Sequence, residues 1–158
     1  MRLLATFIVT LFLATPAVAQ NLKSSAPQEL AERIRSLGYK AELQTDKSGD
    51  PVIISATDGS EFQVYFYGCE KAKDCEWIVF HKGYSLKKTE YAKIRQLVDE
   101  WNLGVNFSKA SIDDDALYLS YNLLMNNEGV GPKIFNSNFA TWLQEYVEFR
   151  KKLAESYK

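Results

Sequence analysis

The sequence is poor in the residues that catalytic and metal sites use most often. It contains only one histidine, His81, and only two cysteines. A lone histidine cannot build a histidine-rich metal site, and the Gly-x-Ser-x-Gly, Gly-x-Gly-x-x-Gly and P-loop motifs are all absent. We therefore expect no catalytic residue, no cofactor and no metal, with His81 facing solvent at the end of a strand.

An excess of charge of one sign is also missing. The 19 lysines and arginines nearly balance the 20 aspartates and glutamates, which gives a net charge of −1. Proteins that bind nucleic acid or anionic membranes usually carry a clear positive excess, so this balance argues against both partners. The acidic run Asp113-Asp114-Asp115 lacks the glycine and the distant glutamate of an EF-hand calcium loop, and it is interpreted as part of a charged turn over residues 111–115.

Long hydrophobic runs are limited to the first residues. Met1-Arg2 gives a basic start, residues 3–13 are apolar apart from two threonines, and Ala17-Val18-Ala19 forms a small-x-small site. This is the layout of a secretory signal peptide over residues 1–19. An uncleaved anchor is the alternative, although the run is short for a membrane span. We expect a periplasmic or secreted protein in which residues 20–158 form one domain without a membrane span.

Hydrophobic periodicity divides the rest of the chain into helices and strands. A first helix is predicted up to Leu37, a second over Lys87–Trp101 and a third over Ser137–Glu155. Alternating segments predict strands over residues 39–43, 52–56, 61–69 and 75–81, and two more around residues 105–107 and 117–121. The order α-β-β-β(-β)-α-β-β-α predicts an α+β fold, with helices packed on a twisted, mostly antiparallel sheet.

The two cysteines lie where two aromatic strands meet a short charged tip. Phe62, Val64 and Phe66 share one face of the first strand, and the spacing of Cys69 and Cys75 is C-x5-C. In an exported chain an even pair of cysteines indicates a disulfide, which here would fix the hairpin tip. The alternative is a redox pair, but thiol oxidoreductases usually carry C-x-x-C at the start of a helix.

Three tyrosines alternate away from the faces predicted to be buried. Tyr65 and Tyr67 point away from the face of Phe62, and Tyr118 alternates with Leu117 and Leu119. Tyrosine is enriched in protein interfaces, so an exposed row of these residues is a candidate contact surface. The alternative is that a helix covers them.

Several short segments combine into a family signature. They are Gly38-Tyr39, the segment from Phe62 to Cys69 with Cys75-Glu76-Trp77, the helix end Leu97–Asn102, Phe107-Ser108-Lys109, and Trp142. In this combination the chain resembles the YbjN-domain family, a bacterial family described as regulators of sensory transduction. Asp99 departs from the family pattern, which tends to have asparagine there.

The resemblance implies a fold like that of type III secretion chaperones. It also implies structural roles for four signature residues, Trp77, Trp101, Asn102 and Trp142. It brings no catalytic residues, and it implies binding or regulation with an unknown protein partner, and a possible homodimer by analogy with those chaperones. Similarity of fold is weak evidence for function.

Two functions therefore remain open. The first is an exported, non-enzymatic binding or regulatory protein that acts through protein–protein contacts in the bacterial envelope, and it requires an exposed apolar or tyrosine patch. The second is a carboxylate-dependent envelope hydrolase or a small-ligand-binding protein, and it requires a concave pocket in which carboxyl groups converge.

Overall fold

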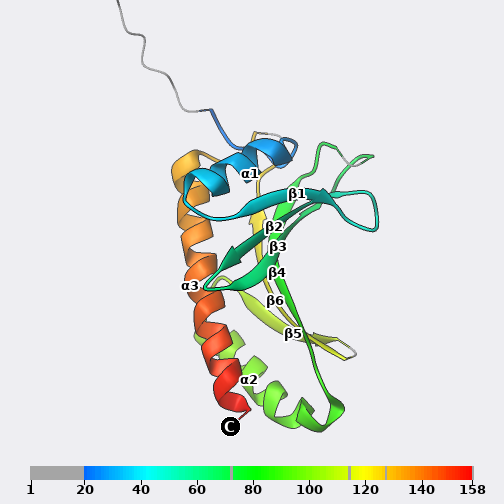
Figure 1. Cartoon of the computed structure of the whole chain (residues 1–158), viewed down its shortest axis with the longest axis vertical. Coiled ribbons are helices and arrows are strands. Elements are labelled where there is room, and N and C mark those ends of the chain that lie inside the picture. Colours follow the sequence, from blue (N-terminus) through cyan, green and yellow to red (C-terminus); the bar gives the residue numbers. More distant parts are fainter. Residues whose placement is uncertain (1–19, 72, 114, 127, 158) are drawn as a thin grey trace, which may run out of the picture.

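The structure is a computed structural model that describes residues 20–71, 73–113, 115–126 and 128–157. The predicted signal peptide, residues 1–19, lies outside these ranges. Helices and strands follow one another along the described chain as shown in Figure 1. In order they are α1 (Pro27–Ser36), β1 (Ala41–Thr45), β2 (Pro51–Thr57), β3 (Ser60–Tyr67), β4 (Trp77–Ser85), η1 (Lys88–Glu90), α2 (Tyr91–Gly104), β5 (Lys109–Asp113), β6 (Ala116–Leu124) and α3 (Pro132–Ser156).

The strands form one six-stranded sheet in the order β1-β2-β3-β4-β6-β5, with antiparallel pairing throughout. Tight hairpins set much of this order. Asp58 and Gly59 connect β2 to β3 with positive φ at both positions, which is the conformation of a two-residue hairpin turn. The expected α+β fold, with packed helices on an antiparallel sheet, is confirmed.

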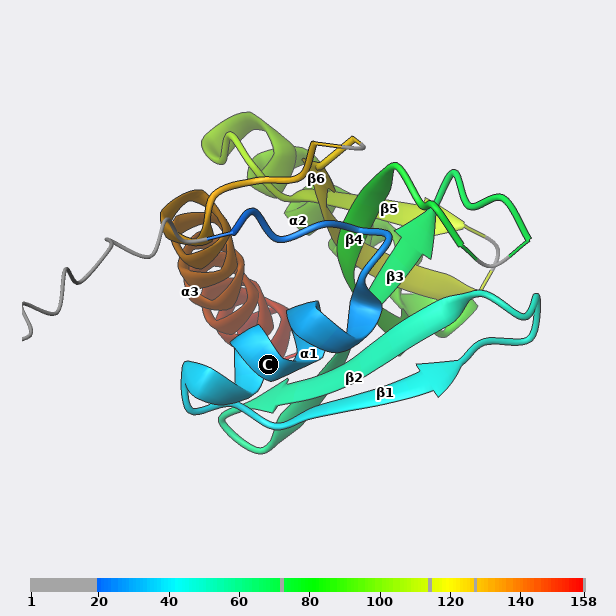
Figure 2. The same cartoon turned by 90° about the horizontal axis from the view of Figure 1, so that it is seen from above.

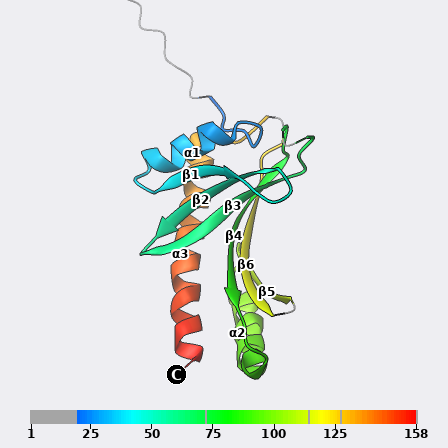
Figure 3. The same ribbon diagram turned by 45° about the vertical axis from the view of Figure 1, so that its right-hand side comes forward.

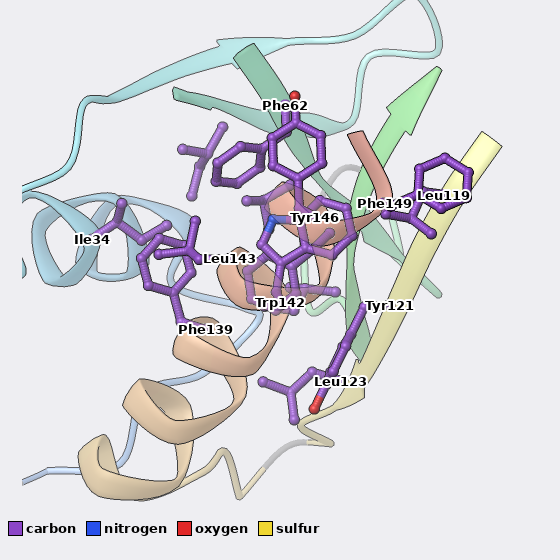
Figure 4. Packing of buried hydrophobic residues seen from close by; sticks show 14 of the residues in the cluster. Ile34, Phe62, Leu119, Tyr121, Leu123, Phe139, Trp142, Leu143, Tyr146 and Phe149 are labelled. Carbon is purple, nitrogen blue, oxygen red and sulfur yellow. The ribbon is translucent and has the colours of Figure 1, made fainter. Parts of the chain in front are cut away.

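The helices pack on one side of the sheet. Seen from above, the twisted sheet curves around α1 and α3, and its other face points outward (Figure 2). A second view places α1 near one end of α3 and α2 near the other (Figure 3). The core between α3 and the sheet is strongly aromatic (Figure 4), with Phe62 edge-on to Trp142 at 5.6 Å and Phe80 stacked on Trp142 at 5.9 Å.

One predicted strand is wrong. The segment around Val105 and Phe107 is a loop, and the strand that follows α2 is β5, which includes Ser111–Asp113 of the predicted turn. Val105 is the C-cap of α2: its N–H makes the last helical bond, to the carbonyl of Trp101, and its own backbone is already extended. The alternation of apolar residues in this loop therefore reflects helix termination and not strand pairing.

Two helix boundaries also differ from the prediction. The second helix begins at Tyr91 after a 3-10 turn, and not at Lys87. The third begins at Pro132, ahead of the predicted Ser137, because proline fits the first helical position, where its fixed φ is favourable and its missing N–H is not needed. Among the described residues, none of the helices is long and apolar enough to cross a membrane.

Candidate functional site

The face of the sheet opposite α3 carries a row of aromatic side chains. Strand pairing sets Tyr67 directly opposite Trp77. Residues two apart on a strand share a face, which adds Tyr65 on β3 and His81 on β4. Tyr118 on β6 joins them, because it pairs with the β4 residue two positions after His81. We call this set the aromatic strip: Tyr65, Tyr67, Trp77, His81 and Tyr118.

The five rings form one continuous path across three strands. Trp77 and Tyr67 stack with their centroids 5.9 Å apart and their planes 13° apart. Tyr65 lies 6.4 Å from Tyr67 and 5.5 Å from His81, and His81 lies 5.2 Å from Tyr118. Aromatic pairs of this kind contribute roughly 0.5–1.5 kcal/mol each beyond their buried area. The strip is therefore held in place by its own contacts.

The strip has a packed base and an exposed edge. Val52 and Val79 pair with Tyr65 from either side and are almost fully buried. Tyr67 is 45% exposed, and Leu124, which pairs with Trp77, is 62% exposed. Aromatic and aliphatic groups of this kind are typical of the centre of a protein interface.

Uncharged polar side chains lie next to the rings of the strip. Gln63 and Ser120 pair with His81 on its two sides, and Asn122 pairs with Val79. The Nδ1 atom of His81 lies 2.9 Å from the Ser120 hydroxyl oxygen. These amides and hydroxyls can form hydrogen bonds with a partner without adding charge to the surface.

Burial keeps the centre of the strip neutral. His81 is half-buried, and this burial lowers the pKa of its imidazole, so the ring is uncharged at neutral pH. Burial is also the main cause that raises the pKa of Tyr65, with further increases from Tyr67, Asp46 and Tyr118. The strip therefore offers rings and hydrogen-bonding groups instead of charge.

The structure places the three predicted tyrosines on one face, and no helix of the described residues covers them. Their role in binding stays a prediction. The position expected for His81 is wrong, since it lies in the middle of β4 and connects Tyr65 to Tyr118. Trp77 was expected only as a structural signature residue, yet it lies in the strip. Whether Trp77 lies on the same face as Tyr67 depends on the register of the hairpin, and alternation within each strand does not fix that register.

A disulfide joins Cys69 to Cys75 at the tip of the β3–β4 hairpin. The tip packs against residues 21–24, which we call the N-terminal strap. The hydroxyl of Ser24 donates a hydrogen bond to the carbonyl of Cys75, and both residues are buried. Leu22 pairs with Val130 in an antiparallel bridge, so the strap connects the hairpin tip to the loop before α3.

Two of the signature tryptophans lie in the core. Trp142 on α3 is fully buried against Phe80. Trp101 on α2 meets Phe149 edge-on at 5.0 Å, and its Nε1 donates to the hydroxyl of Ser108 at 3.3 Å. These contacts explain their presence by packing, and the fourth signature residue, Asn102, lies at the end of α2 beside β5.

Two hollows outside the strip have charged walls. A groove of about 380 Å³ between α2 and the end of α3 is lined by Lys93, Gln96, Leu97, Glu100, Lys152, Glu155 and Ser156. A pocket of about 440 Å³ beside the disulfide is lined by Lys23, Ser25, Gly68, Glu70, Asp74 and Glu76. In the described ranges, no group of three or more histidine, cysteine or carboxylate side chains could hold a metal ion. Carboxylates line both hollows, Glu100 and Glu155 in the groove and Glu70, Asp74 and Glu76 in the pocket.

Comparison with known proteins places this geometry in a family. A solved structure similar to the chain is that of YbjN from E. coli, described as "a putative transcription regulator", with a TM-score of 0.55 and 14% sequence identity. The match covers 72% of this chain and 80% of that chain, and at this identity it shows the fold. No curated protein matches the chain. The family model YbjN, described as "Putative bacterial sensory transduction regulator", matches residues 26–155, and the chain belongs to this family.

Proposed function

We propose that the chain is an exported, non-enzymatic regulatory protein that binds a protein partner through the aromatic strip. The family description supports a regulatory role. The observation that carries the proposal is the strip itself, in which five rings contact one another on a sheet face that none of the helices in the described part of the chain covers. Tyrosine and tryptophan are the residues that most often dominate binding energy at protein interfaces.

The envelope location rests on two features of the chain. The first residues have the layout of a signal peptide. The bond between Cys69 and Cys75 is of a kind that persists in oxidising compartments such as the periplasm. Mass spectrometry of the protein purified from the envelope would test both, since it should begin at Gln20 and yield two thiols only after reduction.

The chemistry of the strip indicates which kind of partner surface it would bind. Its centre is aromatic and uncharged, so the matching surface is apolar, with groups that hydrogen-bond to Gln63 and Asn122 at the rim. Binding of this kind gains little from long-range charge attraction. We therefore expect the affinity for the partner to change little between low and high salt.

Site-specific photo-crosslinking in living cells tests the proposal. A photoreactive amino acid replaces Tyr67, which is 45% exposed, in the full chain. The matched control replaces Tyr157, which is 48% exposed and follows α3, away from the strip. We expect a light-dependent adduct with one other protein at position 67 and not at position 157, and a lower yield when Tyr118→Ala is added.

Equal adducts at positions 67 and 157, or none at either, would contradict the proposal. If the adduct forms only with a second copy of the chain, the strip mediates self-association and does not bind a different protein. The yield of the adduct at position 67 is also compared between low-salt and high-salt samples. An uncharged contact should give similar yields in both.

A further inference from the structure

The sheet splits between β3 and β4 on the side that faces α3. Pairing of β3 with β4 ends at Gln63 and His81. Beyond this point β4 continues to Ser85 alongside β6, whereas β3 extends back to Ser60 alongside β2. Figures 1 and 3 show the β2–β3 hairpin diverging towards α3 while β4 continues towards α2. We call this split the strand fork.

A tyrosine from α3 occupies the fork. The hydroxyl of Tyr146 lies 2.6 Å from the Ser60 hydroxyl and donates to the carbonyl of Glu61 at 3.1 Å. Arg150, one helical turn later, places its guanidinium over the Tyr146 ring, 5.5 Å from the ring centroid. The helix therefore brings a cation to the fork at a fixed position.

The β4 side of the fork brings a second cation. Lys82 and Tyr84 follow Phe80 at alternate positions, so they share the face that packs on α3, and Tyr84 contacts Phe149 there. The Lys82 ammonium lies over the Tyr84 ring, 5.8 Å from its centroid. Lys82 therefore lies over Tyr84 on β4, and Arg150 lies over Tyr146 on α3.

These two cations lack carboxylate partners. The ion pairs within the described residues join Lys40 to Glu42 and to Glu61, and neither Lys82 nor Arg150 takes part in one. Both side chains are half-buried, where the attraction between opposite charges is stronger than in open solvent. The fork therefore carries uncompensated positive charge in a protein that is nearly neutral overall.

Both cations approach Tyr84. Burial, as the largest cause, and the neighbouring Tyr146 raise the pKa of the Tyr84 hydroxyl, which therefore stays protonated, and the charge of Arg150 lowers it. Arg150 is therefore close to Tyr84, whose ring already lies under the Lys82 ammonium.

We propose that the strand fork binds an oxyanion, a phosphate or a carboxylate group, between Lys82 and Arg150, the two cations that approach Tyr84. Charge-assisted hydrogen bonds from lysine and arginine are the stronger kind. The site lies on the helix-covered side of the sheet, so it is independent of the aromatic strip and of the proposed protein contact.

Nuclear magnetic resonance of the oxidised protein tests this directly. Inorganic phosphate is titrated at constant ionic strength against sodium chloride, and acetate is titrated in a second series. We expect saturable shifts at Lys82–Ser85, at Arg150 and at Ser60. Tighter binding of phosphate would assign the site to phosphate groups, and tighter binding of acetate would assign it to carboxylates.

Three variants and one control decide the outcome. Lys82→Ala and Arg150→Ala should each weaken binding about tenfold. Tyr84→Phe keeps the ring under Lys82 and removes only an inaccessible hydroxyl, so it should change binding much less than the loss of either charge. Lys47→Ala removes the same charge in the β1–β2 turn and should change nothing. Shifts that do not saturate, or equal effects of Lys47→Ala and Lys82→Ala, would overturn the proposal.

Discussion

The side-chain amide of Asn102 makes two hydrogen bonds to the backbone of Ala110. Its Oδ1 accepts from the Ala110 N–H at 2.8 Å, and its Nδ2 donates to the Ala110 carbonyl at 2.9 Å. Ala110 lies in β5, an edge strand of the sheet, so the amide occupies the place of a further strand. The end of α2 thereby closes this edge, and Lys109 reinforces the contact by donating to the Asn102 carbonyl.

Replacing Asn102 by alanine should therefore have two effects. The N–H and carbonyl of Ala110 would lose their partners in a partly buried site, which costs about 1–3 kcal/mol. The uncovered edge could then pair with another chain. We expect a lower urea midpoint and self-association of Asn102→Ala, measured by unfolding and by light scattering.

Asn122→Ala is the matched control for this prediction. Asn122 is exposed on β6, in the middle of the open face, and the substitution is chemically the same. It should leave the urea midpoint and the molar mass nearly unchanged. If both variants lose the same stability, the contact with Ala110 is not the cause.

This contact also shows why the sequence predicted the helix end but not its role. The helical spacing predicted an end at Trp101, within one turn of Gly104, where α2 ends. The partner of Asn102 depends on where the chain becomes a strand again, and the alternation of Val105 and Phe107 placed that point too early. Because the last carbonyls of a helix still hold the following residues, local alternation there is a poor guide to strand pairing.

The candidate site, too, was predicted from the sequence only in part. Alternation within β3 and β6 correctly indicated that Tyr65 and Tyr118 avoid the core. Their common surface arises because β6 lies next to β4, with β5 outside it, and this order follows from long-range packing. No spacing in the sequence could show that His81 would connect the two tyrosines, because it lies on a third strand whose register the hairpin tip decides.

The N-terminal strap depends on a glycine. Gly129 has a positive φ of 74°, and a Cβ atom there would lie 2.3 Å from the carbonyl oxygen of Leu22. Gly129→Ala should therefore displace the strap and lower stability, because the clash is with backbone that cannot rotate away. We expect faster tryptic cleavage at Lys23, measured by mass spectrometry.

Gly49→Ala provides the control for the strap. Gly49 also has a positive φ, of 91°, but nothing lies within 4 Å of the added Cβ. It should show the backbone strain of alanine at positive φ without faster cleavage at Lys23. Equal cleavage of the Gly49 and Gly129 variants would mean that the strap is not held by this contact.

Loss of the disulfide should loosen the same strap. Replacing Cys69 and Cys75 together by alanine removes a short covalent loop, for which the chain-entropy model gives about 2 kcal/mol. The carbonyl of Cys75 holds Ser24, so greater freedom of the tip should also expose Lys23 to trypsin. Chemical denaturation and the rate of cleavage at Lys23 measure the two effects.

Ser24→Ala separates these effects. It removes the hydrogen bond to Cys75 while the disulfide remains. We expect faster cleavage at Lys23 with a smaller loss of stability than in the double cysteine variant. A double variant that is less stable but no more sensitive at Lys23 would contradict the connection between disulfide and strap.

The pH dependence of stability should report on His81. Its pKa is lowered in the folded protein by burial, so on acidification the unfolded chain takes up a proton first, near pH 6.5. The stability that comes from the neutral ring is complete above that pH, and it is lost as the pH falls from there through the lower pKa of the folded protein. His81→Asn can still hydrogen-bond to Ser120 but does not titrate. We expect the melting temperature of the wild type to fall more than that of His81→Asn between about pH 8 and pH 5.

The groups around His81 act on its protonation in opposite directions, so the sign of the effect is informative. The groups that face it are the rings of Tyr65 and Tyr118 and the hydroxyl of Ser120, from the strands on either side. Tyrosine rings attract a cation, which opposes the effect of burial. If burial dominates, the wild type loses more stability on acidification than His81→Asn. If the wild type instead gains stability relative to His81→Asn as the pH falls, the two rings stabilise the imidazolium, and the strip becomes positively charged in mildly acidic conditions.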